Sequence, residues 1–264
     1  MSSSTVPRAY FVPAGENRYL PTEHTGGAWR DDEQHLAPVS GLIVHHMERW
    51  RQANADPSLV FSRLAFEVLG QIPREAIELS TEILRPGRTI ELVETTAVIG
   101  DRVVIRARGW LLQSSDTEDV AGDEFAPLPH PDSAPDYPIA QFWDGGFINS
   151  VSCKLVGDHR PGRGRAWMTT ELDLVQGEAA SPLADFVRLV DTANGVAVRE
   201  SVEQWMFPNV DLTLHFFRQP RGRWVGLDTR VAFGPGGIGL TSSVLHDLDG
   251  PVGAVQQSLT LRRR

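Results

Sequence analysis

Asp211 is an acidic residue at the start of a predicted strand, where acidic residues are uncommon. The stretch PNVDLTLHFFRQP, residues 208–220, alternates apolar and polar side chains, which is typical of a strand with one buried face. Asp211 falls on the polar face together with Thr213 and His215. Two interpretations remain open: a solvated charge at the edge of a sheet, or a carboxylate that takes part in a functional site.

Gln257 is a polar residue on the apolar face of the last predicted strand, VGAVQQSLTLR. It shares that face with Val255 and Leu259, whereas the neighbouring Gln256 falls on the polar face. An unpaired buried amide costs about 1–3 kcal/mol, so Gln257 needs hydrogen-bond partners inside the protein. We predict that Gln257, and not Gln256, points into the interior, either as a satisfied core amide or as part of a site.

Both candidates lie in the second of two similar halves. Each half is predicted to contain an amphipathic helix, at residues 34–50 and 181–195, followed by strands. Ser181 suits the N-cap of the second helix, and Pro182 suits its first helical position. The predicted strands span residues 58–70, 76–87, 89–100, 102–113, 210–217, 223–233, 237–248 and 252–262.

Identical residues at a constant spacing indicate an internal duplication. The pairs separated by 148 residues are Leu64 and Leu212, Gln71 and Gln219, Leu79 and Leu227, and Thr81 and Thr229. After the turn GPGGIG we expect a spacing of 150, which makes Ala107 the counterpart of Gln257. The counterpart of Asp211, at a spacing of 148, is Arg63. Because the halves differ at these two positions, we expect a site in one half only.

Residues 113–138 separate the two halves. They are rich in Pro, Ser and acidic residues and show no helical or strand periodicity, so they are predicted to form a linker. We therefore expect an N-terminal unit at 1–112, a linker at 113–138 and a C-terminal unit at 139–264. One helix with an antiparallel sheet in each unit places the chain in the α+β class. A duplicated unit of this kind predicts a double hot-dog fold, with the two sheets continuous or side by side.

The composition argues against several functional classes. The formal net charge of −9 argues against a nucleic-acid partner, which needs a basic surface. No apolar run reaches the roughly 18 residues of a membrane span, and the N-terminus lacks the apolar core of a signal peptide. The single cysteine, Cys153, allows no internal disulfide, which fits a reducing compartment. We therefore expect a cytoplasmic protein without a membrane span.

Five segments of the chain carry a resemblance to a known family. They are GGAWRDDEQH, LRPGRTIELVETTAVIGDRVVIRARG, DTANGV, VDLTLHFFRQPRGRW and LHDLDGPVGAVQQSLTLR. In their order and spacing, over roughly residues 10–262, the chain resembles the double hot-dog acyl-CoA thioesterases and is similar to acyl-CoA thioesterase II. The resemblance implies an acyl-CoA substrate, hydrolysis without a metal or cofactor, and a homo-oligomer.

The resemblance also implies which residues act. In that family an Asp, a Thr and a Gln of the second unit hold the attacking water, and the matching positions here are Asp211, Thr229 and Gln257. A thioester needs a positioned water, a group that accepts its proton, and donors for the developing oxyanion. We expect Asp211 to line a pocket with Gln257, within reach of one shared water.

Three further residues are candidates for substrate binding. Trp29, ahead of the first helix, and His35, at its start, line a pocket unless Trp29 belongs to the core, and Asp191 in VDTANG is either a pocket residue or solvated. Two other functions stay open. One is a non-catalytic acyl-CoA-binding or lipid-binding hot-dog protein. The other is a hot-dog acyl-CoA hydratase, which would need a His and an Asp placed together near a helix; the sequence shows no clear pair of this kind.

Overall fold

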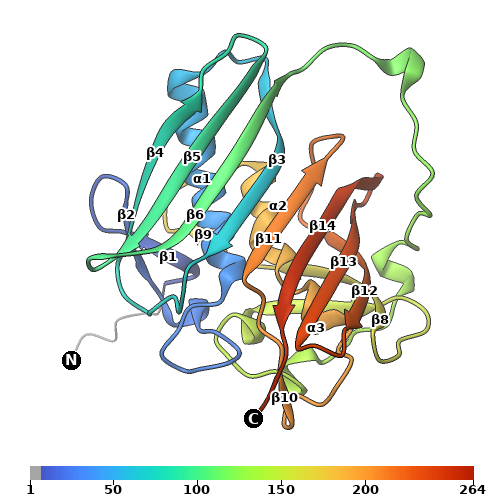
Figure 1. Ribbon diagram of the computed structural model, residues 1–264. Helices are drawn as coiled ribbons and strands as arrows, with labels where there is room; N and C mark the ends of the chain where they lie inside the picture. Colours follow the sequence, from blue (N-terminus) through green and yellow to red (C-terminus); the bar gives the residue numbers. More distant parts are fainter. Residues whose placement is uncertain (1–6) are drawn as a thin grey trace.

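A single curved sheet of thirteen strands runs through both halves of the chain (Figure 1). The computed structural model describes residues 7–264. Neighbouring strands are antiparallel, apart from the parallel pair that β1 makes with β9. In order across the sheet, the strands are β7 (Val151–Leu155), β8 (Arg163–Thr170), β12 (Val225–Phe233), β13 (Ile238–Asp247), β14 (Gly250–Thr260), β11 (Asp211–Phe216), β3 (Leu59–Val68), β6 (Arg102–Gln113), β5 (Ile90–Ile99), β4 (Ile77–Arg85), β2 (Arg18–Pro21), β1 (Ala9–Pro13) and β9 (Asp173–Val175).

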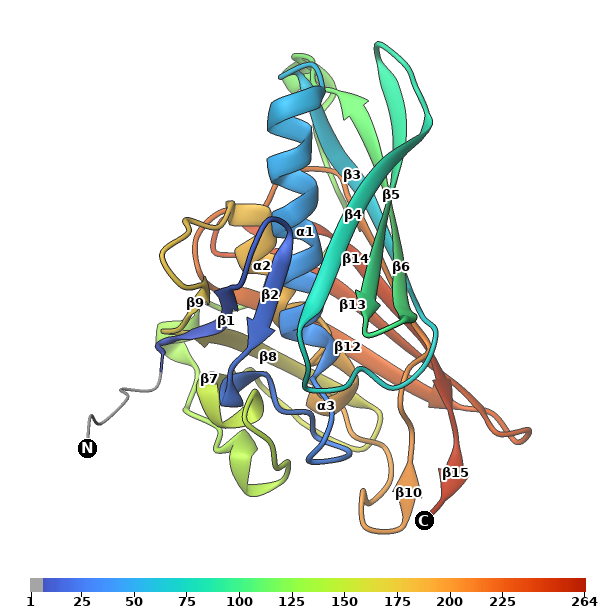
Figure 2. The same ribbon diagram turned by 90° about the vertical axis from the view of Figure 1, so that its left-hand side faces the viewer.

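Two helices lie on the same side of this sheet, which curves around α1 (Figure 2). The long helix α1 (Leu36–Asn54) is capped by His35, and α2 (Pro182–Val190) is capped by Ser181. A short helix, α3 (Ala193–Val196), follows α2, and a separate two-stranded sheet pairs β10 (Trp205–Met206) with β15 (Arg262–Arg263). None of the helices in residues 7–264 is both long and apolar enough to cross a membrane.

The two helices cross at a glycine. A Cβ atom added to Gly41 would lie 2.4 Å from the Cβ of Arg188, so no larger side chain fits at this point of α1 without a shift of α2. The contact brings the backbones of α1 and α2 close together. It thereby fixes how the end of α2 faces the sheet.

The two half-sheets join at β3 and β11, which confirms the expected double hot-dog arrangement with a continuous sheet. Ala65 and Thr213 are opposite each other in this pair, and they are also separated by the 148 residues of the duplication. The pair therefore lies on the pseudo-twofold axis that relates the halves. The N-terminal half contributes α1 and the C-terminal half contributes α2. Strands of both halves form the common sheet.

The spacing of 148 persists to the end of the chain, so the expected change to 150 is wrong. Ser243 pairs with Val255 between β13 and β14, as Thr95 pairs with Ala107 between β5 and β6. Ala107 therefore corresponds to Val255. The first-half counterpart of Gln257 is Gly109.

Residues 114–138 leave the end of β6 and run along the outside of the second half (Figure 1). Residues 114–127 are exposed, whereas the part that follows packs onto the outer face of the sheet. Leu128 joins a small apolar cluster with Trp167 and Trp224, and the indole N–H of Trp167 donates to the carbonyl of Pro129 at 2.8 Å. The segment predicted as a linker thus contains a free span and a docked span.

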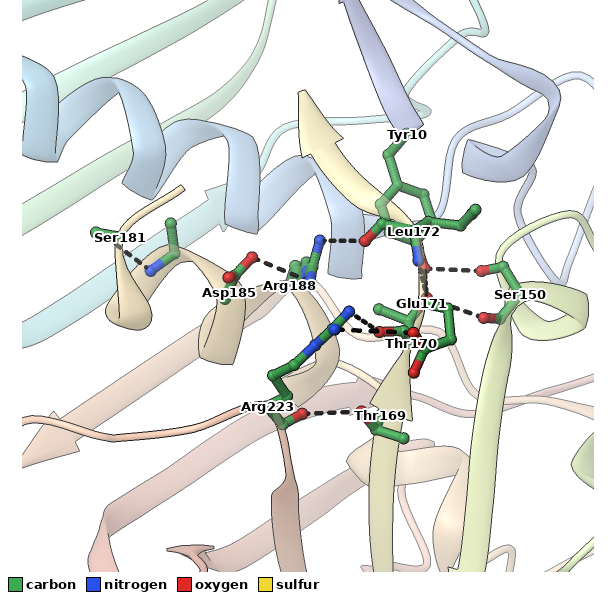
Figure 3. Close-up of polar contacts among 11 residues, drawn as sticks. Tyr10, Ser150, Thr169, Thr170, Glu171, Leu172, Ser181, Asp185, Arg188 and Arg223 are labelled. Carbon is green, nitrogen blue, oxygen red and sulfur yellow. Dashed lines mark hydrogen bonds and ion pairs between the residues drawn. The ribbon is translucent and has the colours of Figure 1, made fainter. Parts of the chain in front are cut away.

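A buried polar network ties β1 of the first half to strands of the second half (Figure 3). The Tyr10 hydroxyl lies 2.7 Å from the Ser150 hydroxyl and donates to the Thr170 hydroxyl at 3.1 Å. Above the Tyr10 ring, the guanidinium of Arg188 donates to the carbonyl of Leu172 at 2.9 Å. Because these contacts join β1, α2 and the end of β8, the halves are held together beyond the β3–β11 seam.

Candidate active site

Gln257 is fully buried on the inner face of β14, whereas Gln256 is exposed, which confirms the prediction from strand alternation. Its side-chain N–H group donates to Oδ1 of Asp191 at 2.7 Å. Asp191 lies at the C-terminal end of α2, so the contact joins the sheet to the helix that crosses it.

Asp191 is the centre of this cluster and is only 4 % exposed. Its Oδ1 atom accepts two hydrogen bonds, one from Gln257 and one from the amide of Asn209 at 2.8 Å. Its Oδ2 atom is 3.5 Å from Nδ1 of His35. One carboxylate oxygen is therefore held by two amides, while the other faces His35.

Burial raises the pKa of Asp191 to about 7, although the hydrogen bonds from Asn209 and Gln257 act in the opposite direction. The loss of hydration destabilises the carboxylate more than the hydrogen bonds from the two amides stabilise it. A carboxyl group with a pKa near neutrality accepts protons more readily than an ordinary Asp, while it is still ionised at physiological pH in a useful fraction of molecules. This is the property expected of a general base.

His35 occupies the N-cap position of α1, where its Nδ1 accepts a hydrogen bond from the Ala37 backbone N–H at 3.1 Å. Burial lowers the pKa of His35 to about 4, so the ring is neutral at pH 7. Because Nδ1 is an acceptor, the ring proton belongs on Nε2. Nδ1 of His35, which already accepts from Ala37, and Oδ2 of Asp191 are then two acceptors 3.5 Å apart, so no hydrogen bond joins them while Asp191 is ionised.

Asn209 was missed in the sequence. It follows Pro208 directly before β11, and its amide donates both to Asp191 and to the backbone carbonyl of Asp211 at 2.9 Å. The local pattern does not distinguish Asn209 as a site residue, because an Asn next to a Pro is a common turn signal. Its role depends on the end of α2, eighteen residues earlier in the chain.

A pocket of about 420 Å³ opens beside these residues. Its lining includes Asp191, Asn209, His35 and Trp29, together with Leu36 at the first position of α1. The residues expected to bind substrate, Trp29, His35 and Asp191, therefore share one pocket. They come from the segment before α1 and from the end of α2.

Asp211 does not line this pocket, so the expectation that it shares a water with Gln257 is wrong. In the register of β11 and β14, Thr213 is opposite Gln256, which places Asp211 on the outer face and Gln257 on the inner face. The Asp211 carboxylate instead accepts from the backbone N–H of Ser258 at 2.5 Å. The acid that meets Gln257 is Asp191, because it approaches from the helix side of the sheet.

Thr229 is buried on β12, but it also lies outside the pocket lining. Its hydroxyl lies 2.8 Å from the Ser243 hydroxyl. The first half has the same cross-strand pair, since the hydroxyls of Thr81 and Thr95 are 2.6 Å apart. A pair that is present in both halves is explained by the common scaffold, and the geometry gives Thr229 no contact with Asp191.

The His–Asp pair that the sequence did not reveal is present. His35 and Asp191 are 156 positions apart along the chain, and they meet at the N-terminus of α1. Their proximity follows from the crossing of α1 and α2, which no local pattern shows. The sequence-based argument against a hydratase is therefore wrong.

Within residues 7–112, the part of the first half that the structure describes, there is no equivalent of this polar cluster. Phe61 occupies the position that corresponds to Asn209, and Gly109 the position that corresponds to Gln257. A Cβ atom added to Gly109 would lie 2.5 Å from the Phe61 ring, so this ring fills the space beside the glycine. The halves therefore differ, as expected. The pairs that differ at the cluster are Asn209 with Phe61 and Gln257 with Gly109, and not Asp211 with Arg63.

The fold and the polar cluster together define a double hot-dog protein with one site per chain. The first half, residues 25–112, matches the acyl-CoA thioesterase N-terminal domain, and residues 122–261 match the acyl-CoA thioesterase C-terminal domain. The chain belongs to the acyl-CoA thioesterase family and is a thioesterase, an enzyme that hydrolyses thioesters.

Solved structures share the fold over nearly the whole chain. A candidate thioesterase from Novosphingobium aromaticivorans is 16 % identical with a TM-score of 0.72, and covers 96 % of this chain and 98 % of its own. The acyl-CoA thioesterase II TesB2 from Mycobacterium marinum is 16 % identical with a TM-score of 0.65, at 96 % coverage of both chains. A hot-dog protein of unknown function from Alicyclobacillus acidocaldarius is 12 % identical, with a TM-score of 0.69 and coverage of 96 % and 95 %. No curated protein sequence gives a significant match.

Proposed function

We propose that this thioesterase acts on acyl-CoA and uses Asp191 to activate the attacking water without a metal ion. The observation that carries the proposal is that the two oxygens of the Asp191 carboxylate have different surroundings. The amides of Gln257 and Asn209 hold Oδ1, and Oδ2 is left beside the pocket. A carboxylate held in this way has one oxygen for orientation and one oxygen for chemistry.

In the proposed reaction, Asp191 accepts a proton from water as the water oxygen attacks the thioester carbonyl carbon. The C–S bond then breaks, the proton passes to the leaving sulfur, and free acid and coenzyme A are the products. In the first turn of α1 the Ala37 N–H donates to the His35 cap and Pro38 has no N–H, whereas the Leu36 N–H has no intrahelical acceptor and Leu36 lines the pocket. The Leu36 N–H is suited to stabilise the oxyanion, assisted by the positive end of the helix dipole.

The test is release of free thiol from a panel of acyl-CoA thioesters by the wild-type protein and two matched variants. Asp191→Asn keeps the acceptor oxygen for Gln257 but removes the base, so hydrolysis should fall by roughly 10²–10⁴-fold. Asp211→Asn makes the same chemical change on the outer face of β11 and should leave the rate near that of the wild type. Equal rates for Asp191→Asn and wild type would show that Asp191 is not the base.

The contact between His35 and Asp191 favours a second activity to measure beside hydrolysis, the hydration of an enoyl-CoA. A hydratase uses such a pair to move a proton between water and the substrate carbon chain. Loss of the enoyl absorbance without thiol release would select this function. Binding of acyl-CoA with neither reaction would select the non-catalytic alternative.

We further propose a cytoplasmic homo-oligomer. Cys153 is buried, and burial raises its pKa to about 12, so the only thiol of the chain is protected and no disulfide depends on it. Exposed apolar side chains at one end of β4, β5 and β6 supply a surface for a second copy; they are Ile83, Leu84, Ile90 and Leu112. Light scattering after size exclusion measures the mass in solution, and a monomer would refute the oligomer.

A further inference from the structure

A second, much smaller hollow lies next to the pocket, on the inner side of His35. Its volume is about 20 Å³, which is enough for about one water molecule. His35, Trp29 and Asn194 line both spaces, so the small hollow continues from the pocket into the interior. The rest of its lining is mostly apolar and includes Ile139, Trp143, Ile148 and Gly195.

Two aromatic rings, Trp29 and Trp143, line this inner space, and the ring of Phe207 packs against both of them. Trp29, Trp143 and Phe207 contact one another edge to face, with ring centroids 5.2 to 6.0 Å apart. They come from three separate segments: the chain before α1, the chain after the linker, and the chain before β11. Trp143 is 7 % exposed and Phe207 is 1 % exposed, so the rings are held by packing on several sides.

The two spaces differ in polarity. The open pocket carries charged and amide side chains at its rim, among them Arg30, Glu33, Gln71 and Arg262. This rim suits the polar pantetheine and nucleotide parts of coenzyme A. The inner hollow, with Ile139 and Ile148, suits a hydrocarbon group, because only apolar contacts are offered over most of its surface.

We infer that the inner hollow is the acyl subsite and that Trp29 and Trp143, backed by Phe207, restrict the enzyme to acyl groups of about two or three carbons, because the hollow has room for about one water-sized group beyond the carbonyl. The inference rests on the proposed function, since it assigns the acyl end of the same substrate. A longer chain meets the indole of Trp143. A chain within the limit places its carbonyl near His35 and Asp191.

Two variants change the hollow in opposite directions. Trp143→Leu removes one of the two rings that line the hollow and should raise kcat/KM for octanoyl-CoA relative to butyryl-CoA by about tenfold or more. Gly195→Ala adds a methyl group within ordinary contact distance of Trp143, 3.4 Å from its indole nitrogen, and therefore fills the hollow without a clash. This variant should lower kcat/KM for propionyl-CoA relative to acetyl-CoA by about tenfold.

The experiment measures kcat/KM for acetyl-, propionyl-, butyryl-, octanoyl- and palmitoyl-CoA with all three proteins, with circular dichroism as the control for folding. A wild-type preference for short chains that shifts in opposite directions in the two variants is the expected result. Efficient hydrolysis of palmitoyl-CoA by the wild type overturns the inference, and so does a profile that neither variant changes. If no thioester is hydrolysed, the proposed function fails, and calorimetric affinities for the same series decide the chain-length limit separately.

Discussion

At the scale of single residues, the proposed role of Asp191 as the base predicts how activity depends on pH. Only its ionised form accepts a proton from water, and burial raises its pKa to about 7. The value of kcat/KM should therefore rise with pH through about 7 and level off above it. His35 should add no inflection in this range, because its pKa is lowered to about 4. Rates between about pH 5 and pH 9, corrected for spontaneous hydrolysis, measure this, and a flat profile would contradict it.

The same pKa makes Asp191 a cost to stability at neutral and alkaline pH. Folding raises the pKa from near 3.8 to about 7, so the folded state favours the protonated form. The stability that protonated Asp191 contributes is fully present below about pH 4 and is lost as the pH rises through 7. Asp191→Asn does not titrate, so its melting temperature at pH 8 should exceed that of the wild type by several degrees. The difference should shrink towards pH 4, and Asp211→Asn should show no such trend.

The sequence named Trp29, His35 and Asp191 as pocket candidates and predicted the burial of Gln257, but it misplaced Asp211. Gln257 was predicted correctly because strand alternation is a local property, and the cost of a buried amide holds in any fold. Asp211 was misassigned because its position before a strand was given more weight than its parity, which already placed it on the polar face. Asp191 and Asn209 meet through the packing of α2 against β14, and no spacing along the chain expresses that contact.

At the scale of elements, the crossing of α1 and α2 positions both sides of the site, since His35 begins one helix and Asp191 ends the other. Gly41→Ala would place a methyl carbon 2.4 Å from the Cβ of Arg188, and either helix must shift to relieve the contact. We expect a loss of about 1–3 kcal/mol in the free energy of unfolding.

Urea denaturation of the Gly41 variant measures this loss, with Gly122→Ala as the matched control. Gly122 has no heavy atom within 4 Å of an added Cβ, so this variant should stay within about 0.5 kcal/mol of the wild type. A Gly41→Ala protein as stable as its control would show that the helices separate at little cost. The helices and most strands were predictable from periodicity and caps, whereas this crossing was not.

At the scale of the whole molecule, the duplication has produced two halves with different contents. The pair Asn209 and Gln257 binds Asp191, whereas the corresponding pair Phe61 and Gly109 is packed as core. The repeat spacing of 148 was visible in the sequence. Its persistence through β14 was not, because chance identities at 150 obscured the true register that strand pairing defines.

The continuous sheet has a consequence for the linkage between the halves. The β3–β11 seam and the contacts of α1 with α2 hold the halves together, while residues 114–127 are exposed. The peptide connection there is dispensable for assembly, and the enzyme should tolerate being made as two polypeptides. Fragments 1–120 and 121–264, produced together, should form a heterodimer with thioesterase activity. Dilution should weaken it, since separate chains lose the high effective concentration that a tether provides.

Activity of the mixed fragments as a function of concentration measures this complementation, and each fragment alone is the control. Fragments that never combine would show that the linker, and not the seam, guides the pairing. In the intact chain, the tether then has a different task. It ensures that each half with the Asp191 carboxylate is paired with one half in which Phe61 fills the corresponding space. Two freely exchanging copies of one ancestral unit could not maintain this one-to-one ratio.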